Sequence, residues 1–183
     1  MELKIVSSNE LSKNDFRVIN KFRSQEFGVD IPSNSISSNE DQDSFYFLLK
    51  VGDNLLAFAL LEELPLKFRH ESVLVLFVST VIATQKGRGY GVRVLTEIQK
   101  YAKEKGRTLL GFCETDIIPY YQKCGFRILS NEENQFVYVD ENDVVIPNIV
   151  PGEVFYIDGS DQIFKRILSN RDKRVRVRRP RTA

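Results

Sequence analysis

The segment Ser72–Thr84 constrains the fold of this chain more than any other, because nine of its thirteen residues are apolar and many are β-branched. Such a run predicts a strand that is covered on both faces and therefore lies inside a sheet. A glycine-rich loop follows at 85–91, then a helical pattern that ends at Gly106, then a second apolar strand at Thr108–Cys113. A strand, a helix and a strand in this order predict a right-handed crossover between parallel strands.

Further elements are expected on both sides of this unit. Before the unit, periodicity and turn residues predict strands at Glu2–Ser7, Phe45–Val51 and Asn54–Glu62, a helix from Ser8 or Asn9 to Phe27, and a loop at Gly28–Ser44. After it, they predict a short helix within Asp116–Lys123, a closing hairpin of Phe126–Leu129 with Gln135–Val139, and a helix capped by Ser160 or Asp161. We therefore expect an α/β fold (α+β mixed sheet), in which a central mixed β-sheet is flanked by helices. The 183 residues suit a single domain. We place this domain at residues 1–168, followed by a basic C-terminal tail at 169–183.

Charge is unevenly distributed along the chain. Residues 165–183 carry nine Lys or Arg and one Asp, a net charge of +8, so the other residues sum to 1 − 8 = −7. A basic end can bind nucleic acid, but valines alternate with arginines here, which favours a strand-like or solvated tail. A nucleic-acid partner is accordingly not expected. The sequence has no run of 18 apolar residues and no signal-peptide pattern, so we expect a cytoplasmic protein without a membrane partner.

Metal sites and hydrolase triads are poorly supported by the residues available. The chain has two cysteines, Cys113 and Cys124, and one histidine, His70. These three residues do not have the number or spacing of a zinc site, so no metal is expected. His70 lies in a polar stretch and is expected in a solvated loop, which argues against a Ser-His-Asp or Cys-His mechanism.

The loop Gln85-Lys86-Gly87-Arg88-Gly89-Tyr90-Gly91 joins the central strand to the helix. Its glycines allow positive φ and the close approach of a ligand, and the N-terminus of a helix favours an anion. Lys86 and Arg88 would add ionic contacts to phosphate. A P-loop would require Lys and Ser or Thr after Gly91, and a Rossmann fingerprint would require Gly or Ala at Val92 or Val94, so both motifs fail. The remaining alternatives are a different phosphate motif or a simple basic turn.

A second motif, Pro119–Phe126, has the pattern aromatic-Tyr-x-x-x-Gly-Phe. A short helix would end at Gly125, where a C-cap favours positive φ, and Phe126 would begin the next strand. The tyrosines could simply pack in the core. The motif lies about thirty residues after the glycine loop and is separated from it by a helix and a strand.

The two motifs together resemble the GNAT superfamily of N-acetyltransferases, over roughly Val73–Leu129. The acyl-CoA loop of that family has the pattern Gln/Arg-x-x-Gly-x-Gly/Ala. Gly89 and Gly91 match it, whereas Lys86 departs from its first position and lacks a planar fork of donors. The resemblance implies a GNAT-like fold with a splayed pair of parallel strands and acetyl-CoA as co-substrate. It places the co-substrate against Ser79, Val81, Lys86, Gly87, Arg88, Gly89, Tyr90 and Gly91.

The resemblance also implies a mechanism. Backbone groups near Ser79 and Val81 would pair with the pantetheine, and an N–H near Val81 would polarise the thioester carbonyl. Tyr121 would protonate the departing thiolate, and the amine would attack without a covalent intermediate. Glu114 and Asp116 are the candidate general bases. A weaker alternative is a base that acts through water, for which the candidates are Glu26, Glu62 and Glu63. Another weaker alternative is Cys113 as a nucleophile that carries the acyl group.

The acceptor is expected to be a small-molecule amine, and a cationic one would be attracted by the acidic part of the chain. A homodimer is left open. Two alternatives keep the fold, namely transfer from a longer acyl-CoA or an acyl carrier protein, and a non-catalytic acyl-CoA-binding module. The third alternative is a nucleic-acid binder that uses the basic segment 173–179.

Overall fold

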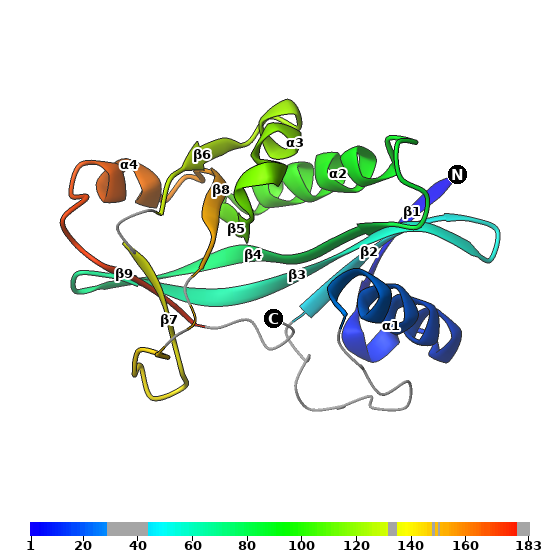
Figure 1. The fold of residues 1–183 in the computed structure, drawn as a ribbon, viewed down its shortest axis with the longest axis horizontal. Helices are drawn as coiled ribbons and strands as arrows, with labels where there is room; N and C mark the ends of the chain where they lie inside the picture. The colour runs from blue at the N-terminus through cyan, green and yellow to red at the C-terminus, as the bar shows by residue number, and fades with distance from the viewer. Residues whose placement is uncertain (29–43, 132–134, 148, 150, 179–183) are drawn as a thin grey trace. The chain divides into compact units, whose positions relative to one another are not determined.

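The computed structural model describes residues 1–28, 44–131, 135–147, 149 and 151–178. The chain forms a mixed α/β fold around a nine-stranded, mostly antiparallel sheet with the order β1-β2-β3-β4-β5-β8-β6, in which β9 pairs with β3 and β7 (Figure 1). The strands are β1 (Glu2–Ser7), β2 (Ser44–Val51), β3 (Asn54–Phe68), β4 (Glu71–Ala83), β5 (Leu109–Cys113), β6 (Arg127–Leu129), β7 (Phe136–Val139), β8 (Glu153–Ile157) and β9 (Val175–Arg178); the α-helices are α1 (Lys13–Phe27), α2 (Tyr90–Lys105), α3 (Ile118–Lys123) and α4 (Ile163–Leu168). The expected fold class is confirmed.

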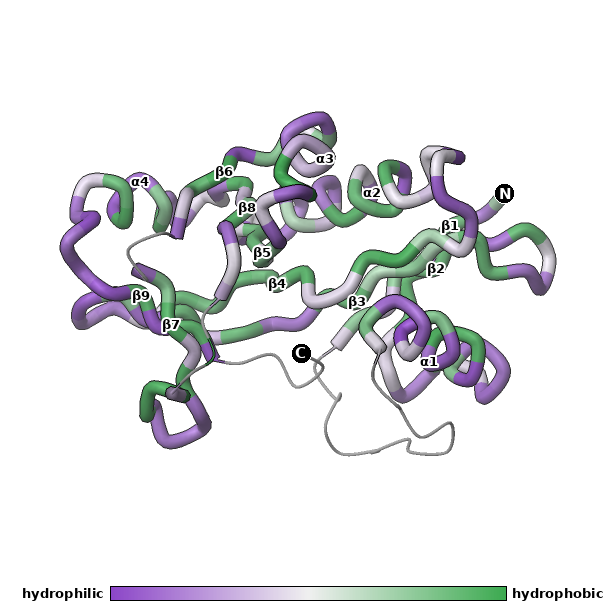
Figure 2. Tube along the Cα trace, in the orientation of Figure 1, coloured by the Kyte–Doolittle hydropathy of each residue, from purple (hydrophilic) through white to green (hydrophobic). Residues whose placement is uncertain are grey.

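The chain divides into two compact units, which are described in turn. The first comprises Met1–Glu62 and Thr80–Ile98, and the second comprises Glu63–Ser79 and Gln99–Ala183. In Figure 2, most of the trace of β4 is coloured as hydrophobic, and the turn between β3 and β4 is coloured as hydrophilic. This pattern agrees with the expectation of a buried strand inside the sheet.

In the first unit, β1, β2 and β3 pair antiparallel in chain order. The helix α1 covers one face of these strands, and its Ile19 packs with Tyr46 and Leu48 of β2 and with Phe58 of β3. All four side chains are buried. The apolar spacing that predicted this helix therefore corresponds to the face that contacts the sheet.

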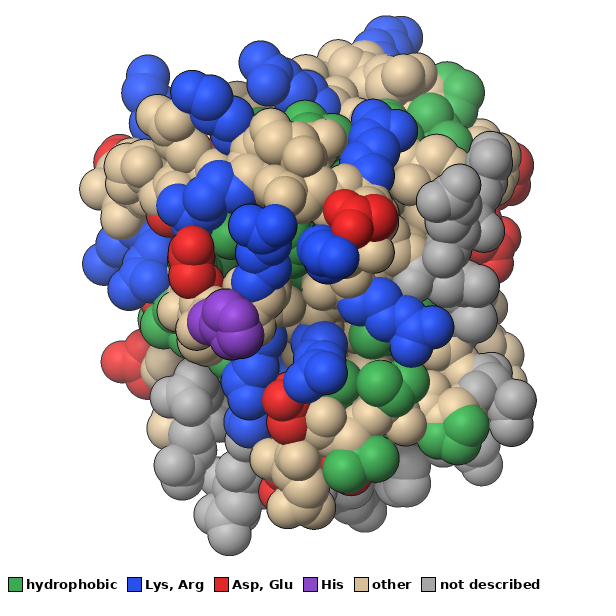
Figure 3. All heavy atoms as spheres, turned by 90° about the vertical axis from the view of Figure 1, so that its left-hand side faces the viewer, with side chains coloured by type: hydrophobic (Ala, Val, Ile, Leu, Met, Phe, Trp, Pro, Cys, Tyr) green, Lys and Arg blue, Asp and Glu red, His purple; other side chains and the backbone are tan. Residues whose placement is uncertain are grey.

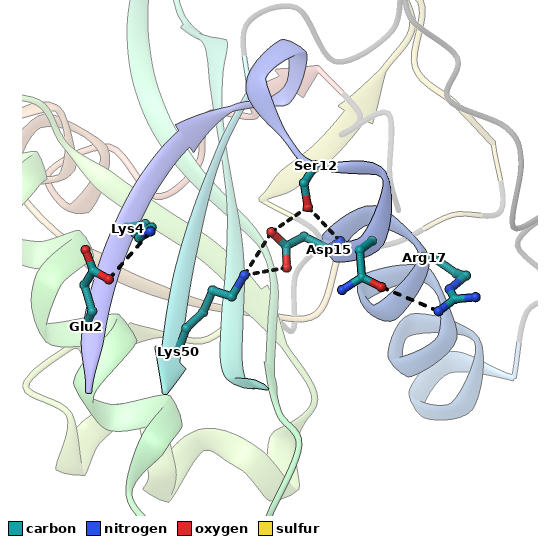
Figure 4. A network of polar contacts seen from close by, with 7 residues as sticks. Glu2, Lys4, Ser12, Asp15, Arg17 and Lys50 are labelled. Carbon is teal, nitrogen blue, oxygen red and sulfur yellow. Dashed lines mark hydrogen bonds and ion pairs between the residues drawn. The ribbon is translucent and has the colours of Figure 1, made fainter. Parts of the chain in front are cut away.

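A polar contact fixes the start of α1 to the end of β2 (Figure 4). The Ser12 hydroxyl caps the helix by accepting the Asp15 N–H at 3.1 Å, and it donates to the Asp15 carboxylate at 2.9 Å. Lys50 Nζ donates to both oxygens of that carboxylate, at 2.8 and 3.1 Å. The side chains of Asp15 and Lys50 are only 11% and 15% exposed, so neither charge is well solvated without the other.

We expect the substitution Asp15→Ala to lower the free energy of unfolding by about 3 kcal/mol, because it leaves the shielded ammonium of Lys50 without its partner. Urea denaturation measures the effect, and Asn14→Ala, at an exposed position in the same helical turn, serves as the control, with a change below about 0.5 kcal/mol. The paired replacement Asp15→Leu with Lys50→Met should recover most of the loss. Equal stability of Asp15→Ala and the control would contradict a structural role for the pair.

In the second unit, β4 and β5 pair in parallel through Leu76–Leu109 and Phe77–Leu110. The predicted crossover from β4 through a helix to β5 is thereby confirmed. The strand β8 pairs antiparallel with both β5 and β6. Its Val154, Phe155 and Tyr156 are buried, which gives this part of the sheet much of its core.

The predicted closing hairpin of Phe126–Leu129 with Gln135–Val139 is wrong. The strand β6 pairs with β8 rather than with β7, and β7 pairs in parallel with β9. The physical reason is that the apolar strand β8, later in the chain, occupies the position beside β6 that a hairpin would have given to β7. The strand β3 also extends to Phe68, beyond the expected end at Glu62, and its last residues pair with β9.

Part of the basic C-terminal segment belongs to the sheet. Val175 and Val177 of β9 are fully buried, while Arg176 between them is exposed. The alternation of valine and arginine thus corresponds to one buried and one exposed face. The boundary between a domain ending at residue 168 and a tail stays a prediction, and most of the predicted loop Gly28–Ser44 lies outside the described residues.

Candidate active site

The glycine-rich loop connects the end of β4 to the start of α2, as expected. Gly87 and Gly89 adopt φ values of 77° and 73°, and a Cβ atom added at either would meet no atom within 4 Å. The carbonyl of Gly89 accepts the first helical hydrogen bond, from the N–H of Arg93 at 3.2 Å. The N–H groups of Tyr90, Gly91 and Val92 therefore lie in the first turn of α2, where a helix has no internal acceptor for them. A loop with open space above its glycines and free helix N–H groups suits an anionic ligand.

The two basic residues of the loop differ in their contacts. Lys86 Nζ forms an ion pair with Glu26 of α1 at 2.5 Å, and the two side chains are 71% and 41% exposed. Since exposed ion pairs contribute about 0–1 kcal/mol, a phosphate could displace Glu26 at little cost. Arg88 is exposed. Lys86 and Arg88 are thus placed beside the start of α2, in agreement with the predicted loop.

The two predicted pantetheine contacts, Ser79 and Val81, lie half-buried near the end of β4. Ser79 belongs to the second compact unit and Val81 to the first. Gly111 of β5 follows directly after the last β4–β5 pair, and a Cβ atom there would lie 2.2 Å from Cζ of Phe155 and 2.8 Å from the carbonyl oxygen of Val78. No side chain fits at residue 111, so the glycine lets the Phe155 ring pack directly on β5.

Tyr121 lies on α3, with its ring stacked on Phe155 at 3.7 Å between centroids and 9° between planes. Phe126 meets the same ring edge-on at 5.7 Å. Gly125, at φ 90°, turns the chain from α3 towards β6, and Gln99 of α2 donates to the Cys124 carbonyl at 2.8 Å. The motif therefore holds the Tyr121 ring rigidly.

The protonation of Tyr121 follows from its surroundings. Its side chain is 9% exposed, and burial, with further contributions from Cys113, Tyr120 and Cys124, raises the pKa of its hydroxyl well above 10. Tyr121 is consequently a neutral proton donor at every physiological pH. The neighbouring Tyr120, whose pKa is also raised by burial, already shares a hydrogen bond with Cys124.

A cavity of about 360 Å³ opens at the end of β5 and is lined by Cys113, Glu114, Thr115, Asn131, Pro151, Gly152 and Glu153. Glu153 pairs with Cys113 in the β5–β8 ladder and accepts the Asn131 N–H at 3.0 Å. Burial, together with the negative charges of Glu153 and Asp116, raises the pKa of the Cys113 thiol to about 11. Because Cys113 in turn raises the pKa of Tyr121, the thiol connects Tyr121 electrostatically with Asp116 and Glu153, and it lines the same cavity as Glu114.

Cys113 is poorly suited to carry an acyl group, because a thiol with a pKa near 11 is almost fully protonated at pH 8. We expect Cys113→Ser to retain acyl transfer within about twofold of the unchanged protein. Iodoacetamide should alkylate Cys113 roughly 100-fold more slowly than an ordinary exposed thiol, in proportion to its thiolate fraction. Mass spectrometry of tryptic peptides measures the rate. Loss of activity in Cys113→Ser, with an acyl group trapped on Cys113 in the unchanged protein, would contradict direct attack.

The predicted site residues thus fall into two groups. The second unit brings Tyr121, Glu114 and Asp116 into the surroundings of Cys113, whereas the loop residues and Val81 belong to the first unit. Of the weaker candidates, Glu26 pairs with Lys86, Glu62 is buried and Glu63 is half-buried. Sequence reasoning missed Glu153, although the pattern Glu-Val-Phe-Tyr-Ile after Pro151-Gly152 is typical of a strand entered from a turn.

Two further observations concern metals and membranes. Among the described residues, no three His, Cys, Asp or Glu side chains come together as metal ligands. No helix in the described ranges combines the length and the hydropathy that spanning a membrane would require.

Known structures share this fold. The structural match to Escherichia coli ElaA covers 86% of this chain and 100% of the ElaA chain, at 17% identity and a TM-score of 0.59. The match to an acyl-CoA N-acyltransferase from Pseudomonas aeruginosa covers 85% of this chain and 99% of the other, at 16% identity and a TM-score of 0.57. The match to the ribosomal-protein-S18-alanine N-acetyltransferase from Escherichia coli covers 85% of this chain and 91% of the other, at 16% identity and a TM-score of 0.52. At these identities the likeness shows the fold alone, and no curated protein matches the chain by sequence.

The family itself is shown by sequence. The model of the acetyltransferase (GNAT) family matches residues 13–126, which run from the start of α1 to the end of the tyrosine motif. This range includes the glycine loop, β5 and Tyr121, so the match covers both motifs that predicted the family. The chain belongs to the GNAT family of acetyltransferases, which are enzymes that transfer an acyl group from acyl-CoA.

Proposed function

We propose that this protein is an N-acetyltransferase that transfers the acetyl group of acetyl-CoA to a small, cationic primary amine by direct attack. The observation that carries the proposal is the glycine loop at the start of α2, where Gly87 and Gly89 leave open space beside helix N–H groups that have no internal acceptor. A pyrophosphate would be held there by backbone N–H groups, with Lys86 and Arg88 as ionic contacts. Gly91, buried in the first turn, would let the ligand approach the helix closely, beside Tyr90.

In the proposed reaction, the nitrogen of the amine attacks the thioester carbon, and the carbon–sulfur bond breaks. The Tyr121 hydroxyl gives its proton to the departing thiolate and is reprotonated from solvent. Backbone groups at Ser79 and Val81 would hold the pantetheine, and the Val81 N–H would stabilise the developing oxyanion.

The raised pKa of Tyr121 makes its hydroxyl a weak acid. It can therefore protonate the departing thiolate efficiently only if the pKa of that thiol is raised as well. The nearby thiol of Cys113 shows how this environment acts, since its pKa rises to about 11. A thiolate released in the same environment would likewise be destabilised relative to a free thiolate, whose pKa is about 8.5. Proton donation from Tyr121 then becomes less unfavourable than it would be in water.

The acceptor's proton has two candidate destinations, Glu114 and Asp116. Glu114 lines the cavity beside Cys113, together with Glu153, and these two carboxylates would favour a positively charged amine. Asp116 is exposed and acts on the same thiol electrostatically. We propose Glu114 as the base, with Asp116 as the alternative, because Glu114 lines the cavity itself.

Isothermal titration calorimetry with acetyl-CoA, CoA and a long-chain acyl-CoA tests the co-substrate. The proposal expects micromolar binding of acetyl-CoA, and release of CoA thiol when a member of an amine library is added. A clear preference for the long-chain donor would favour the alternative acyl group. Binding without turnover of any amine would favour a non-catalytic acyl-CoA-binding module. Absence of binding to all three would refute the proposed role of the loop. The cytoplasmic location and a homodimer stay predictions.

A further inference from the structure

A positively charged hollow lies in the second unit, at the turn between β3 and β4 and the start of β9. Its volume is about 470 Å³, and five Lys or Arg side chains line it: Lys67, Arg69, Lys173, Arg174 and Arg176. Glu71 and Asp143 are the acidic side chains in the lining, so five positive charges face two negative ones, a net charge of +3. Figure 3 shows Lys and Arg side chains gathered around the single histidine, His70, on this face.

The acidic residues in and around the hollow are already paired. Asp143 binds Lys67 at 3.3 Å and Arg176 at 3.1 Å, Glu71 binds Arg166 at 3.1 Å, and Asp172 binds Lys173 at 2.7 Å. In the part of the chain that the structure describes, no ion pair holds Arg69 or Arg174. These two guanidinium groups are exposed and available to an external anion.

The positive surface extends beyond the hollow. The Glu71–Arg166 pair connects it to the face of α4, where Lys165 and Arg166, with Asp161 as the one acidic residue, line a neighbouring hollow of about 420 Å³. On the other side it ends at Asp140 and Glu141, which lie with Arg178 around a small hollow of about 20 Å³. A surface that includes two hollows of this size could contact a ligand much longer than a single small anion.

The lining also limits what kind of partner could bind. It contains neither an aliphatic nor an aromatic side chain apart from His70, so it offers no apolar anchor for a folded protein partner and little stacking surface for bases. Arginine forms paired hydrogen bonds with phosphate oxygens, and repeated phosphates along a chain match an extended row of cations. The sequence adds Arg179 and Arg181 after β9, so the basic character continues along the chain.

We propose that this face binds the phosphate backbone of a nucleic acid without sequence preference, with Arg69 and Arg174 as its principal contacts. The proposal is independent of acyl transfer. It goes against the expectation from sequence that no nucleic acid binds. That expectation treated the basic segment as a tail, whereas the pairing of β9 with β3 places Arg176, and Arg174 just before the strand, beside the β3–β4 turn.

The test is fluorescence anisotropy with a labelled 20-nucleotide single strand, measured between about 0.05 and 0.3 M salt. The full chain is compared with the double variant Arg69→Ala, Arg174→Ala. Loss of two phosphate contacts should weaken binding about 25-fold at 0.1 M salt and make the log–log salt slope shallower by about 1.4. The control is Arg127→Ala with Lys103→Ala, which removes the same charge from exposed residues of β6 and α2 and should bind within twofold of the unchanged protein. Deleting the residues after Ser169 is unsuitable, because it would remove β9 from the sheet.

Each other result would overturn the proposal. Absence of binding by the unchanged chain would overturn it. Equal weakening in the two double variants would also overturn it, because it would indicate that binding depends only on the net charge of the protein. Competition by inorganic triphosphate as effective, per phosphate, as that by the oligonucleotide would assign the hollow to a small anion. Equally tight binding of a polyglutamate peptide of the same charge would assign the face to an acidic protein. Circular dichroism melts confirm that all variants are folded.

Discussion

Replacing Tyr121 by phenylalanine is expected to lower kcat by about 100- to 1,000-fold, the usual contribution of a positioned general acid. The stacking of the ring on Phe155 and its edge contact with Phe126 do not involve the hydroxyl, so the variant should keep its fold. The Kd for acetyl-CoA should change less than threefold, because the proposed role of the hydroxyl begins when the carbon–sulfur bond breaks. Thiol release measures kcat, and calorimetry measures Kd.

The adjacent tyrosine provides a matched control. The Tyr120 hydroxyl shares a hydrogen bond with Cys124 and has no role in the proposed reaction, so Tyr120→Phe should keep kcat within about threefold. An equal loss in both variants would indicate a structural effect of the motif, and unchanged turnover in Tyr121→Phe would remove Tyr121 from the mechanism.

The pH dependence gives a second check on Tyr121. Burial raises the pKa of its hydroxyl, so the proton that it donates is present below that pKa and is lost only as the pH rises through it. Because that pKa lies well above 10, kcat should show no descending limb between pH 7 and pH 10. A descending limb in this range that disappears in Tyr121→Phe would contradict the assignment.

The sequence predicted the local elements of this fold better than their pairing. The strand at Ser72–Thr84, the helix that ends at Gly106 and the crossover to β5 follow from periodicity and chain order, and the structure confirms them. The pairing of β6 with β8 and of β7 with β9 could not be predicted in this way. Neighbouring strands in sequence usually pair, but here the burial of Phe155 and Tyr156 favours a strand from later in the chain.

The candidate site shows a similar limit. The glycine loop and Tyr121 each lie in a short motif, because their backbone requirements are local: positive φ at Gly89 and a helix end at Gly125. Glu153 lies in a recognisable strand pattern, but no local signal indicates which strand it pairs with. It reaches the cavity because β8 pairs with β5 opposite Cys113, and that pairing depends on the whole sheet. The shared position of Arg69 and Arg174 was hidden for the same reason, since β3 and β9 meet only in the folded chain.

Replacing Gly89 by glutamate is expected to weaken acetyl-CoA binding at least 100-fold. A Cβ atom at Gly89 would meet no atom within 4 Å beyond its chain neighbours, so we expect the longer side chain to extend into the space proposed for the pyrophosphate. Its carboxylate would also repel the phosphates at the start of α2. Calorimetry measures the loss, with circular dichroism as the test of folding.

Two comparisons separate the causes of that loss. Gly52, in the turn between β2 and β3, also has positive φ, and a Cβ atom added there would meet no atom within 4 Å, so Gly52→Glu carries a similar backbone strain at a glycine outside the loop. It should bind acetyl-CoA within twofold of the unchanged protein. The glutamine of Gly89→Gln has nearly the same size as the glutamate of Gly89→Glu but no charge. The difference in acetyl-CoA affinity between the two variants therefore measures the repulsion of phosphate, and the loss that remains in Gly89→Gln measures the steric effect of the side chain. If Gly89→Glu binds as tightly as Gly52→Glu, the loop is a turn with no ligand above it, and the phosphates of the co-substrate must bind elsewhere.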